Sequence, residues 1–219
     1  YRMAYAAIDK IVGDLIAKAA PEHFIIASDH GMEPASVSFS LNTWLWEHGY
    51  LKLKSEAEQL FRAYASQLEV NAFDFNRTVA WSAGQGSVIL NDSRFNNVAQ
   101  NVDLAGLIDE LKSEVDPHTG QCPFAAVLRR SEVWNGPYLE DMPDLIVLPN
   151  IDAGYFVHWV MMPVRRYTVY RNGEHGMDGF YLLSSATGQK RAHILQIAPT
   201  ILKLMDVQKP NSFDMSALV

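Results

Sequence analysis

Hydrophobic residues recur at three- and four-residue steps in several segments, which is the spacing of one face of an α-helix. The first such segment runs from Tyr5 to Ala19 and stops before Pro21, a residue that cannot continue a helix. Gly49, Ser55, Asp103 and Pro199 lie where residues of these types end or begin helices. The same reasoning predicts four further helices, at about 41–48, 55–68, 104–111 and 199–205.

Short apolar runs of strand length lie between these predicted helices. They are Phe24–Ser28, Val88–Leu90, Asp144–Leu148 and Phe180–Ser185. Because the first run follows a helix, we expect it to form a buried, parallel strand. The alternation of helices and strands predicts an α/β protein.

The stretch from about 50 to 135 has a less regular pattern than the rest of the chain. We predict that residues 1–219 belong to one domain, with an inserted or cap segment at about 50–135. No linker composition separates that segment from its surroundings.

Composition and charge narrow the functional classes. The chain has 219 residues, of which 48% are hydrophobic and 20% charged, as in an ordinary globular protein. Its formal net charge is −7 and no long basic stretch is present. Binding to a nucleic acid duplex is therefore disfavoured, because it needs a basic face. An anionic substrate stays compatible with this charge, since a bound metal can dominate a site locally.

Cys122 is the sole cysteine, so an intramolecular disulfide framework is excluded and a cytoplasmic location is favoured. The most apolar short run, Tyr155–Val164, is too short to span a bilayer. The chain begins at Tyr1 inside a predicted helix. We therefore expect its natural start, and any targeting signal, to lie further upstream.

Asp29 and His30 form the strongest local signal for chemistry. They follow the apolar run Phe24–Ser28 and precede Gly31. Open α/β sheets bind ligands outside the carboxyl ends of their strands. A carboxylate oxygen beside an imidazole nitrogen suits zinc, manganese or iron. The alternative is that Asp29 caps a turn and His30 is an ordinary loop histidine.

A second signal is His175, which lies in the segment Gly173–Gly176, just before the run Phe180–Ser185. If that run pairs antiparallel with Phe24–Ser28, its start lies at the same sheet edge as Asp29, and His175 joins Asp29 and His30. The alternative is a hairpin loop that carries a surface histidine.

The remaining candidates have structural interpretations. Asp141 and Asp144 precede a predicted strand, and a solvated strand entrance is favoured over acid–base chemistry. The tryptophans Trp44, Trp46 and Trp81 are predicted to lie in the core or an interface. Five histidines are expected to be structural: His23, His48, His118, His158 and His193.

The segment Phe24–Met32, which reads FIIASDHGM, resembles the Ser-Asp-His-Gly-Met signature of type I phosphodiesterases and related phosphohydrolases of the alkaline phosphatase superfamily. Asp74–Asn91 resembles a stretch of the predicted phosphohydrolase/phosphomutase branch. Further resembling segments follow in family order: Leu41–Leu45, Gly49–Leu51, Gly136–Pro137, Pro143–Val147, Gly173–Gly179 and Ile197–Leu202. The resemblance implies an alkaline phosphatase-like α/β/α sandwich with a two-metal site.

Carried over from the family, Asp29 and His30 bind one divalent metal and His175 binds a second. The resemblance implies zinc, with manganese as an alternative, and a small phosphorylated substrate such as a nucleotide. It implies a metal-dependent hydrolase of phosphate esters, most similar to a phosphodiesterase or nucleotide pyrophosphatase that forms a phospho-enzyme. Two such metals activate a Ser or Thr nucleophile and stabilise charge on the transferred oxygens.

This chain departs from the family pattern at one point. The nucleophile, the early Asp and the Asp-x-x-x-His ligands are expected upstream of Tyr1, so no residue here is assigned as nucleophile. We therefore expect an incomplete sandwich that is inactive alone.

Four alternatives stay open: a phosphomutase, a sulfatase or a phosphoethanolamine transferase on the same fold, or a non-catalytic metal-binding or interaction domain. Cys122 and Pro123 do not provide the Cys-x-Pro-x-Arg context of a sulfatase. The oligomeric state is not predicted.

Overall fold

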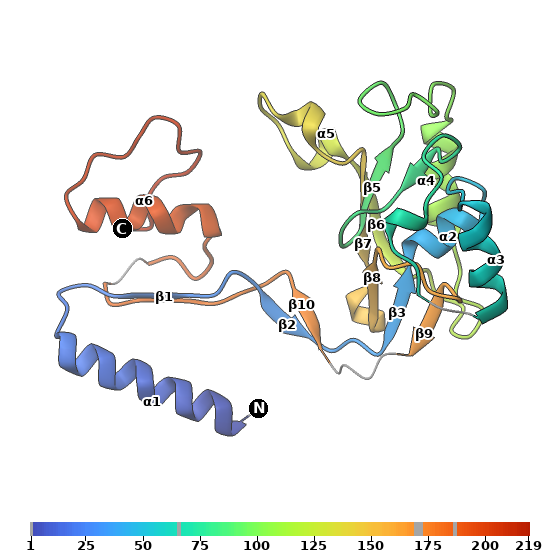
Figure 1. The fold of residues 1–219 in the computed structure, drawn as a ribbon. Coiled ribbons are helices and arrows are strands. Elements are labelled where there is room, and N and C mark those ends of the chain that lie inside the picture. Colours follow the sequence, from blue (N-terminus) through green and yellow to red (C-terminus); the bar gives the residue numbers. More distant parts are fainter. Residues whose placement is uncertain (1, 65–66, 169–172, 186–187) are drawn as a thin grey trace. The chain divides into compact units, whose positions relative to one another are not determined.

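The computed structural model describes residues 2–64, 67–168, 173–185 and 188–219. The chain is a mixed α/β protein that forms two compact units (Figure 1). Unit 1 comprises Tyr1–Met32 and His175–Val219, and unit 2 is the continuous segment Glu33–Glu174. The predicted insertion at about 50–135 lies within unit 2, and its role as a cap stays a prediction.

Unit 1 contains helices α1 (Arg2–Ala19) and α6 (Ile197–Leu204) and strands β1 (Ile25–Ala27) and β11 (Tyr181–Leu183). β1 pairs antiparallel with β11, with Ile25 opposite Leu183. The prediction of a buried, parallel strand at 24–28 is therefore wrong. β1 is partly exposed, which an antiparallel pair tolerates because one of its faces can meet water.

Strands β2 (Gly31–Glu33) and β10 (Glu174–Gly176) pair with each other and carry the chain between the two units. The alternative of a hairpin loop around His175 does not hold, because Glu174–Gly176 is a strand. The backbone there is extended because it finds a strand partner more than a hundred residues earlier in the sequence.

Unit 2 contains two sheets. The four-stranded sheet has the order β4 (Ala80–Trp81), β5 (Ser87–Leu90), β7 (Leu145–Pro149), β6 (Phe124–Arg129), and its neighbours are antiparallel. The three-stranded sheet has the order β8 (Tyr155–His158), β3 (Val37–Ser40), β9 (Arg166–Thr168). Its β3 runs parallel to β8 and antiparallel to β9.

The helices of unit 2 are α2 (Leu41–Glu47), α3 (Ser55–Tyr64), α4 (Leu104–Ser113) and the short α5 (Arg130–Val133). Four 3-10 turns complete the described elements, at Val70–Ala72, Leu139–Asp141, Ile151–Ala153 and Ile194–Gln196.

Capping residues explain where the longer helices begin and end. Ser40 accepts the N–H of Thr43 at the start of α2, and Gly49, with φ of 83°, ends that turn. Asp103 accepts the N–H of Gly106 at 2.9 Å and begins α4, as the sequence predicts. The prediction that the third helix reaches residue 68 is wrong. α3 spans Ser55–Tyr64, and Leu68 lies in a β-bridge, where its N–H donates to the carbonyl of Met161.

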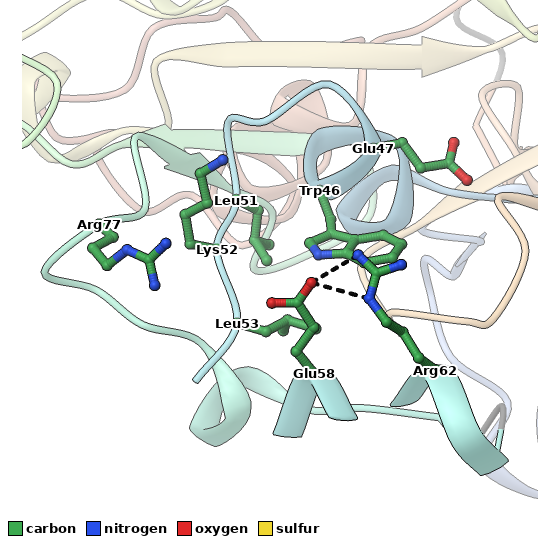
Figure 2. Close-up of a pocket in the computed structure, with 8 residues that line it drawn as sticks. All are labelled: Trp46, Glu47, Leu51, Lys52, Leu53, Glu58, Arg62 and Arg77. Atoms are coloured by element: carbon green, nitrogen blue, oxygen red, sulfur yellow. Dashed lines mark hydrogen bonds and ion pairs between the residues drawn. The ribbon is translucent and has the colours of Figure 1, made fainter. Parts of the chain in front are cut away.

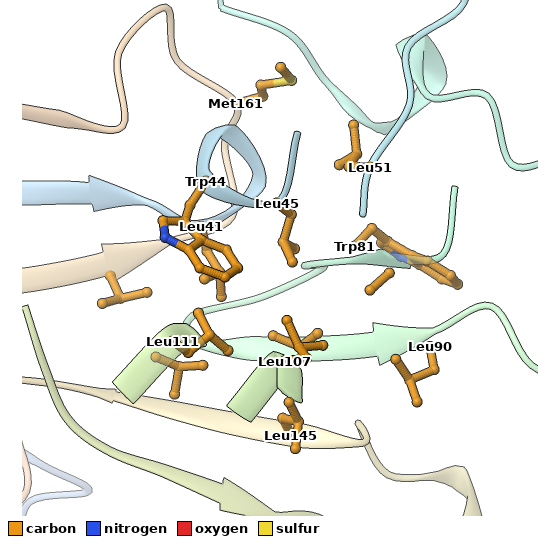
Figure 3. Close-up of a cluster of buried hydrophobic side chains, with 14 of the residues drawn as sticks. Leu41, Trp44, Leu45, Leu51, Trp81, Leu90, Leu107, Leu111, Leu145 and Met161 are labelled. Carbon is orange, nitrogen blue, oxygen red and sulfur yellow. The ribbon is translucent and has the colours of Figure 1, made fainter. Parts of the chain in front are cut away.

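The hydrophobic core of the described chain lies in unit 2, between the four-stranded sheet and helices α2 and α4 (Figure 3). Trp44 and Trp81 are buried there, and Trp46 packs at its margin, as predicted. The other labelled members are Leu41, Leu45, Leu51, Leu90, Leu107, Leu111, Leu145 and Met161.

Asp144 is buried, so the prediction of a solvated strand entrance is wrong for this residue. One carboxylate oxygen lies 2.5 Å from Arg94 Nη2 and accepts the N–H of Leu90 at 2.8 Å, while the other lies 3.4 Å from Arg130 Nη1. Burial of this charge is possible because the two guanidinium groups and the N–H compensate it.

Candidate functional site

Asp29, His30 and His175 come together in unit 1. The imidazole rings of His30 and His175 stack, with centroids 3.7 Å apart and planes inclined by 24°. Asp29 Oδ1 lies 3.6 Å from His30 Nε2. The antiparallel pairing of β1 with β11 brings these distant segments to one place, through the register that the sequence argument requires. Their role as metal ligands stays a prediction.

The orientation of His30 suits a role as a metal ligand. Its Nδ1 lies 2.8 Å from the carbonyl oxygen of Gly31, which accepts a hydrogen bond, so Nδ1 carries the proton. The other ring nitrogen, Nε2, faces Asp29 and is the atom through which the ring would bind a metal ion. Metal–ligand bonds of about 2.1 Å place neighbouring donors of a tetrahedral zinc ion about 3.4 Å apart. The observed 3.6 Å between His30 Nε2 and Asp29 Oδ1 matches that spacing closely.

Two glycines allow the two segments of the site to approach closely. A Cβ atom at Gly31 would lie 1.9 Å from the carbonyl oxygen of Asp178. At Gly179 it would lie 2.6 Å from Ser28 Oγ, which itself accepts the N–H of Phe180 at 2.9 Å. Gly31 and Gly179 therefore have a packing reason to be glycines, because a side chain at either position would collide with the other segment.

A cavity of about 650 Å³ opens beside Asp29. Lys190 and Arg191 contribute two cationic side chains to its wall, and both are exposed. Sequence reasoning missed this pair, although two adjacent basic residues shortly after β11 were a readable signal. The cavity is also lined by residues of the two site segments, among them Ser28, Met177, Asp178 and Tyr181.

The donor atoms of Asp29 and His30 are of the kinds that bind a divalent metal, but they are too few to complete its coordination. Asp29 and His30 supply one oxygen and one nitrogen, both of kinds that zinc and manganese accept. Within the described residues, no group of three or more His, Cys, Asp or Glu side chains is arranged to hold a metal ion. The described site therefore corresponds to part of a coordination sphere.

The other histidines make structural contacts. His48 stacks on Trp44, with ring centroids 3.9 Å apart, and His118 lies 3.3 Å from Asp116. His193 accepts the N–H of Leu195 at the start of a 3-10 turn. His158 is buried, and its burial lowers its pKa to about 4.

A separate cavity of about 420 Å³ lies in unit 2, between α2 and α3 (Figure 2). The guanidinium of Arg62 lies 4.8 Å from the ring centroid of Trp46 and is 2.8 Å from Glu58. Arg77 lies 3.7 Å from Asp74. Because these two cations are already paired with carboxylates, we interpret this cavity as structural.

None of the described helices combines the length and the apolar character that crossing a membrane requires.

Comparison with known proteins assigns the family. The family model of type I phosphodiesterase / nucleotide pyrophosphatase matches residues 1–178 of the chain, a range that includes Asp29, His30 and His175. No curated protein and no solved structure matches the chain. The mixed α/β fold is consistent with the alkaline phosphatase-like fold of such enzymes. The chain therefore belongs to the type I phosphodiesterase / nucleotide pyrophosphatase family.

Proposed function

We propose that the chain is part of a metal-dependent hydrolase of phosphodiester or pyrophosphate bonds. Membership of the family supports a phosphoester hydrolase at the coarse level. The finer proposal is that Asp29 and His30 hold one divalent ion and His175 a second, with zinc as the expected metal. The substrate proposed is a small phosphorylated molecule of the nucleotide class.

The observation that carries this proposal is the convergence of Asp29, His30 and His175 in unit 1. Asp29 offers a carboxylate oxygen, and His30 offers Nε2 while the Gly31 carbonyl holds the ring in place. Such a hydrogen bond to the other ring nitrogen orients a ligating histidine and raises its basicity. The bound ions would supply Lewis-acid stabilisation of charge on phosphoryl oxygens.

The cavity beside Asp29 supports an anionic substrate. Lys190 and Arg191 lie on its wall, where their charges would attract and orient phosphate oxygens. A guanidinium can bind two phosphate oxygens at once, and an ammonium acts as a point charge. We propose no nucleophile among the residues of this chain.

Metal binding is the first test. Titration of zinc into the chelator-treated full chain, monitored by calorimetry, should show saturable binding. Asp29→Ala and His30→Ala should each weaken zinc binding by more than about 100-fold, because loss of a group that only hydrogen-bonds to a metal ligand already costs about 10- to 100-fold. His175→Ala should lower the number of ions bound.

The matched control is His118→Ala, which removes an exposed histidine of unit 2 beside Asp116. It should leave zinc binding unchanged. Equal zinc affinity in the wild type and in all three site variants would contradict the assignment of Asp29, His30 and His175 as ligands.

A further inference from the structure

Unit 2 contains a cavity of about 450 Å³ that is lined by residues of the paired strands β3 and β8. The register places Ser38 opposite Phe156 and Ser40 opposite His158, so these four side chains share one face of the sheet. Their neighbours along the strands, such as Phe39, point to the opposite face and join the hydrophobic core. The cavity therefore lies on the side of the sheet away from the core.

Polar residues on the outer face of a sheet ordinarily meet water, yet Ser38 is only 1% exposed and His158 6%. The hydroxyl of Ser40 is occupied, because it donates to the carbonyl of Val160 at 2.7 Å. Ser38 Oγ is different: it is buried, lines the cavity and has no hydrogen-bond partner among the described residues. Such an orphaned hydroxyl is rare in folded proteins and points to a missing partner.

Aromatic and amide side chains line the cavity together with this hydroxyl. Phe156 and Trp159 supply ring surfaces, and Gln67 and Gln85 supply amide donors and acceptors. The backbone carbonyl of Trp159 accepts a hydrogen bond from the buried side chain of Asn42, which holds this part of the wall in place.

The charges of the described lining residues disfavour a phosphate ligand. Among the described residues that line it, none is a lysine or an arginine, and Glu174 is the one acidic group. His158 Nδ1 accepts the N–H of Val160 at 3.0 Å, and burial lowers the pKa of this ring to about 4, so the imidazole is neutral at pH 7. A neutral ligand suits such a lining, because an unpaired charge would be desolvated there at high cost.

We propose that this cavity binds an uncharged aromatic heterocycle whose edge carries both a hydrogen-bond donor and an acceptor. The ring contacts Phe156 and Trp159, and the edge takes the Ser38 hydroxyl and the amides of Gln67 and Gln85 as partners. The volume lies within the range of about 300–1,000 Å³ that is usual for small-ligand sites. This site is made by unit 2 alone and does not rest on the proposed hydrolase function.

The test is equilibrium binding of adenine and of nicotinamide to the full chain, monitored by two-dimensional NMR in the presence of a chelator. At least one of the two should bind saturably and shift the signals of Phe156 and Trp159. Toluene, which lacks the polar edge, and phenyl phosphate, which is charged, should bind at least about 10-fold more weakly. For toluene this is the loss expected when about one hydrogen bond is missing, and for phenyl phosphate it reflects the cost of desolvating the charge.

Ser38→Ala separates a ligand site from a water-filled structural cavity. It should weaken heterocycle binding by about 5- to 10-fold, the effect of one hydrogen bond. The melting temperature of the free protein should stay equal or rise, because the variant removes a buried hydroxyl that lacks a partner. Ala35→Leu, which adds volume at a buried position of the wall, should abolish binding.

Ser113→Ala is the matched control, since this exposed hydroxyl on α4 lies outside the cavity. It should bind the heterocycle as the wild type does. The proposal is overturned if neither heterocycle binds saturably to the wild type. It is also overturned if Ser38→Ala lowers the melting temperature and leaves binding unchanged.

Discussion

Buried charges in unit 2 are balanced by partners from distant parts of the sequence. Asp116 shows this most clearly. Burial alone would raise the pKa of its carboxyl group, but hydrogen bonds from Tyr155, from the backbone of His118 and from Arg166 outweigh burial and lower the pKa to about 2. Tyr155 Oη donates to Asp116 at 2.6 Å. This network ties the loop at 116–123 to strands β8 and β9.

His158 gives unit 2 a specific response to mild acid. Its pKa is about 4 in the folded protein, against 6.5 ordinarily, so between these values the unfolded chain binds a proton that the folded chain does not. The contribution of His158 to the free energy of unfolding is therefore fully present above pH 6.5. It falls by about 3 kcal/mol in all as the pH decreases towards 4. Urea unfolding followed by tryptophan fluorescence at several pH values measures this slope.

His158→Asn is the informative variant, because an amide oxygen can still accept the N–H of Val160. It should flatten the stability curve between pH 6.5 and 4. Asp116 leaves that window unaffected, since its carboxyl titrates below pH 4. An unchanged slope in the variant would show that another group sets the acid response.

The meeting of His30 with His175 follows from the sequence because a local motif and one strand pairing determine it. The cavity at Ser38 could not be predicted from the sequence, because the burial of Ser38 depends on chain segments far away in the sequence. Asp144 was misjudged for the same reason: its burial needs Arg94 and Arg130, which no local pattern connects to it.

At the scale of elements, local signals predict helices better than strands. The start of α4, the end of α2 and the end of α1 follow from Asp103, Gly49 and Pro21, which act within one turn. The strand character of β10 and the β-bridge at Leu68 depend on long-range backbone partners, which the sequence pattern does not reveal.

The cap of α4 provides a prediction at this scale. Asp103→Ala removes the acceptor for the N–H of Gly106 and should destabilise unit 2 by about 1 kcal/mol. Asp103→Asn keeps an acceptor oxygen and should lower the stability of unit 2 much less. Chemical denaturation of the two variants beside the wild type measures the difference. Equal losses would mean that the charge of Asp103, rather than its hydrogen bond, stabilises the helix.

At the scale of the whole molecule, the hydrophobic core belongs to one continuous segment. Unit 2 is made by Glu33–Glu174 and contains both larger sheets and the buried tryptophans. We predict that residues 33–174, expressed alone, fold cooperatively. Thermal unfolding followed by near-ultraviolet circular dichroism should show a single sharp transition.

The control for this prediction is the same fragment with Trp44→Ala, which removes a fully buried ring from the core. It should unfold at a much lower temperature, because such truncations cost about 3–5 kcal/mol. A wild-type fragment without fixed aromatic signals would show that unit 2 needs the remainder of the chain.

The pairing of β1 with β11 has a consequence for the order of events during synthesis. The hydrogen bond from Phe24 to Ser184 joins residues 160 positions apart, and unit 2 lies between them. On the ribosome, residues 33–174 emerge and can collapse before β11 exists, whereas Asp29 and His30 must wait for His175. Nascent chains released before about residue 185 would therefore contain a formed core but no partner for the first strand.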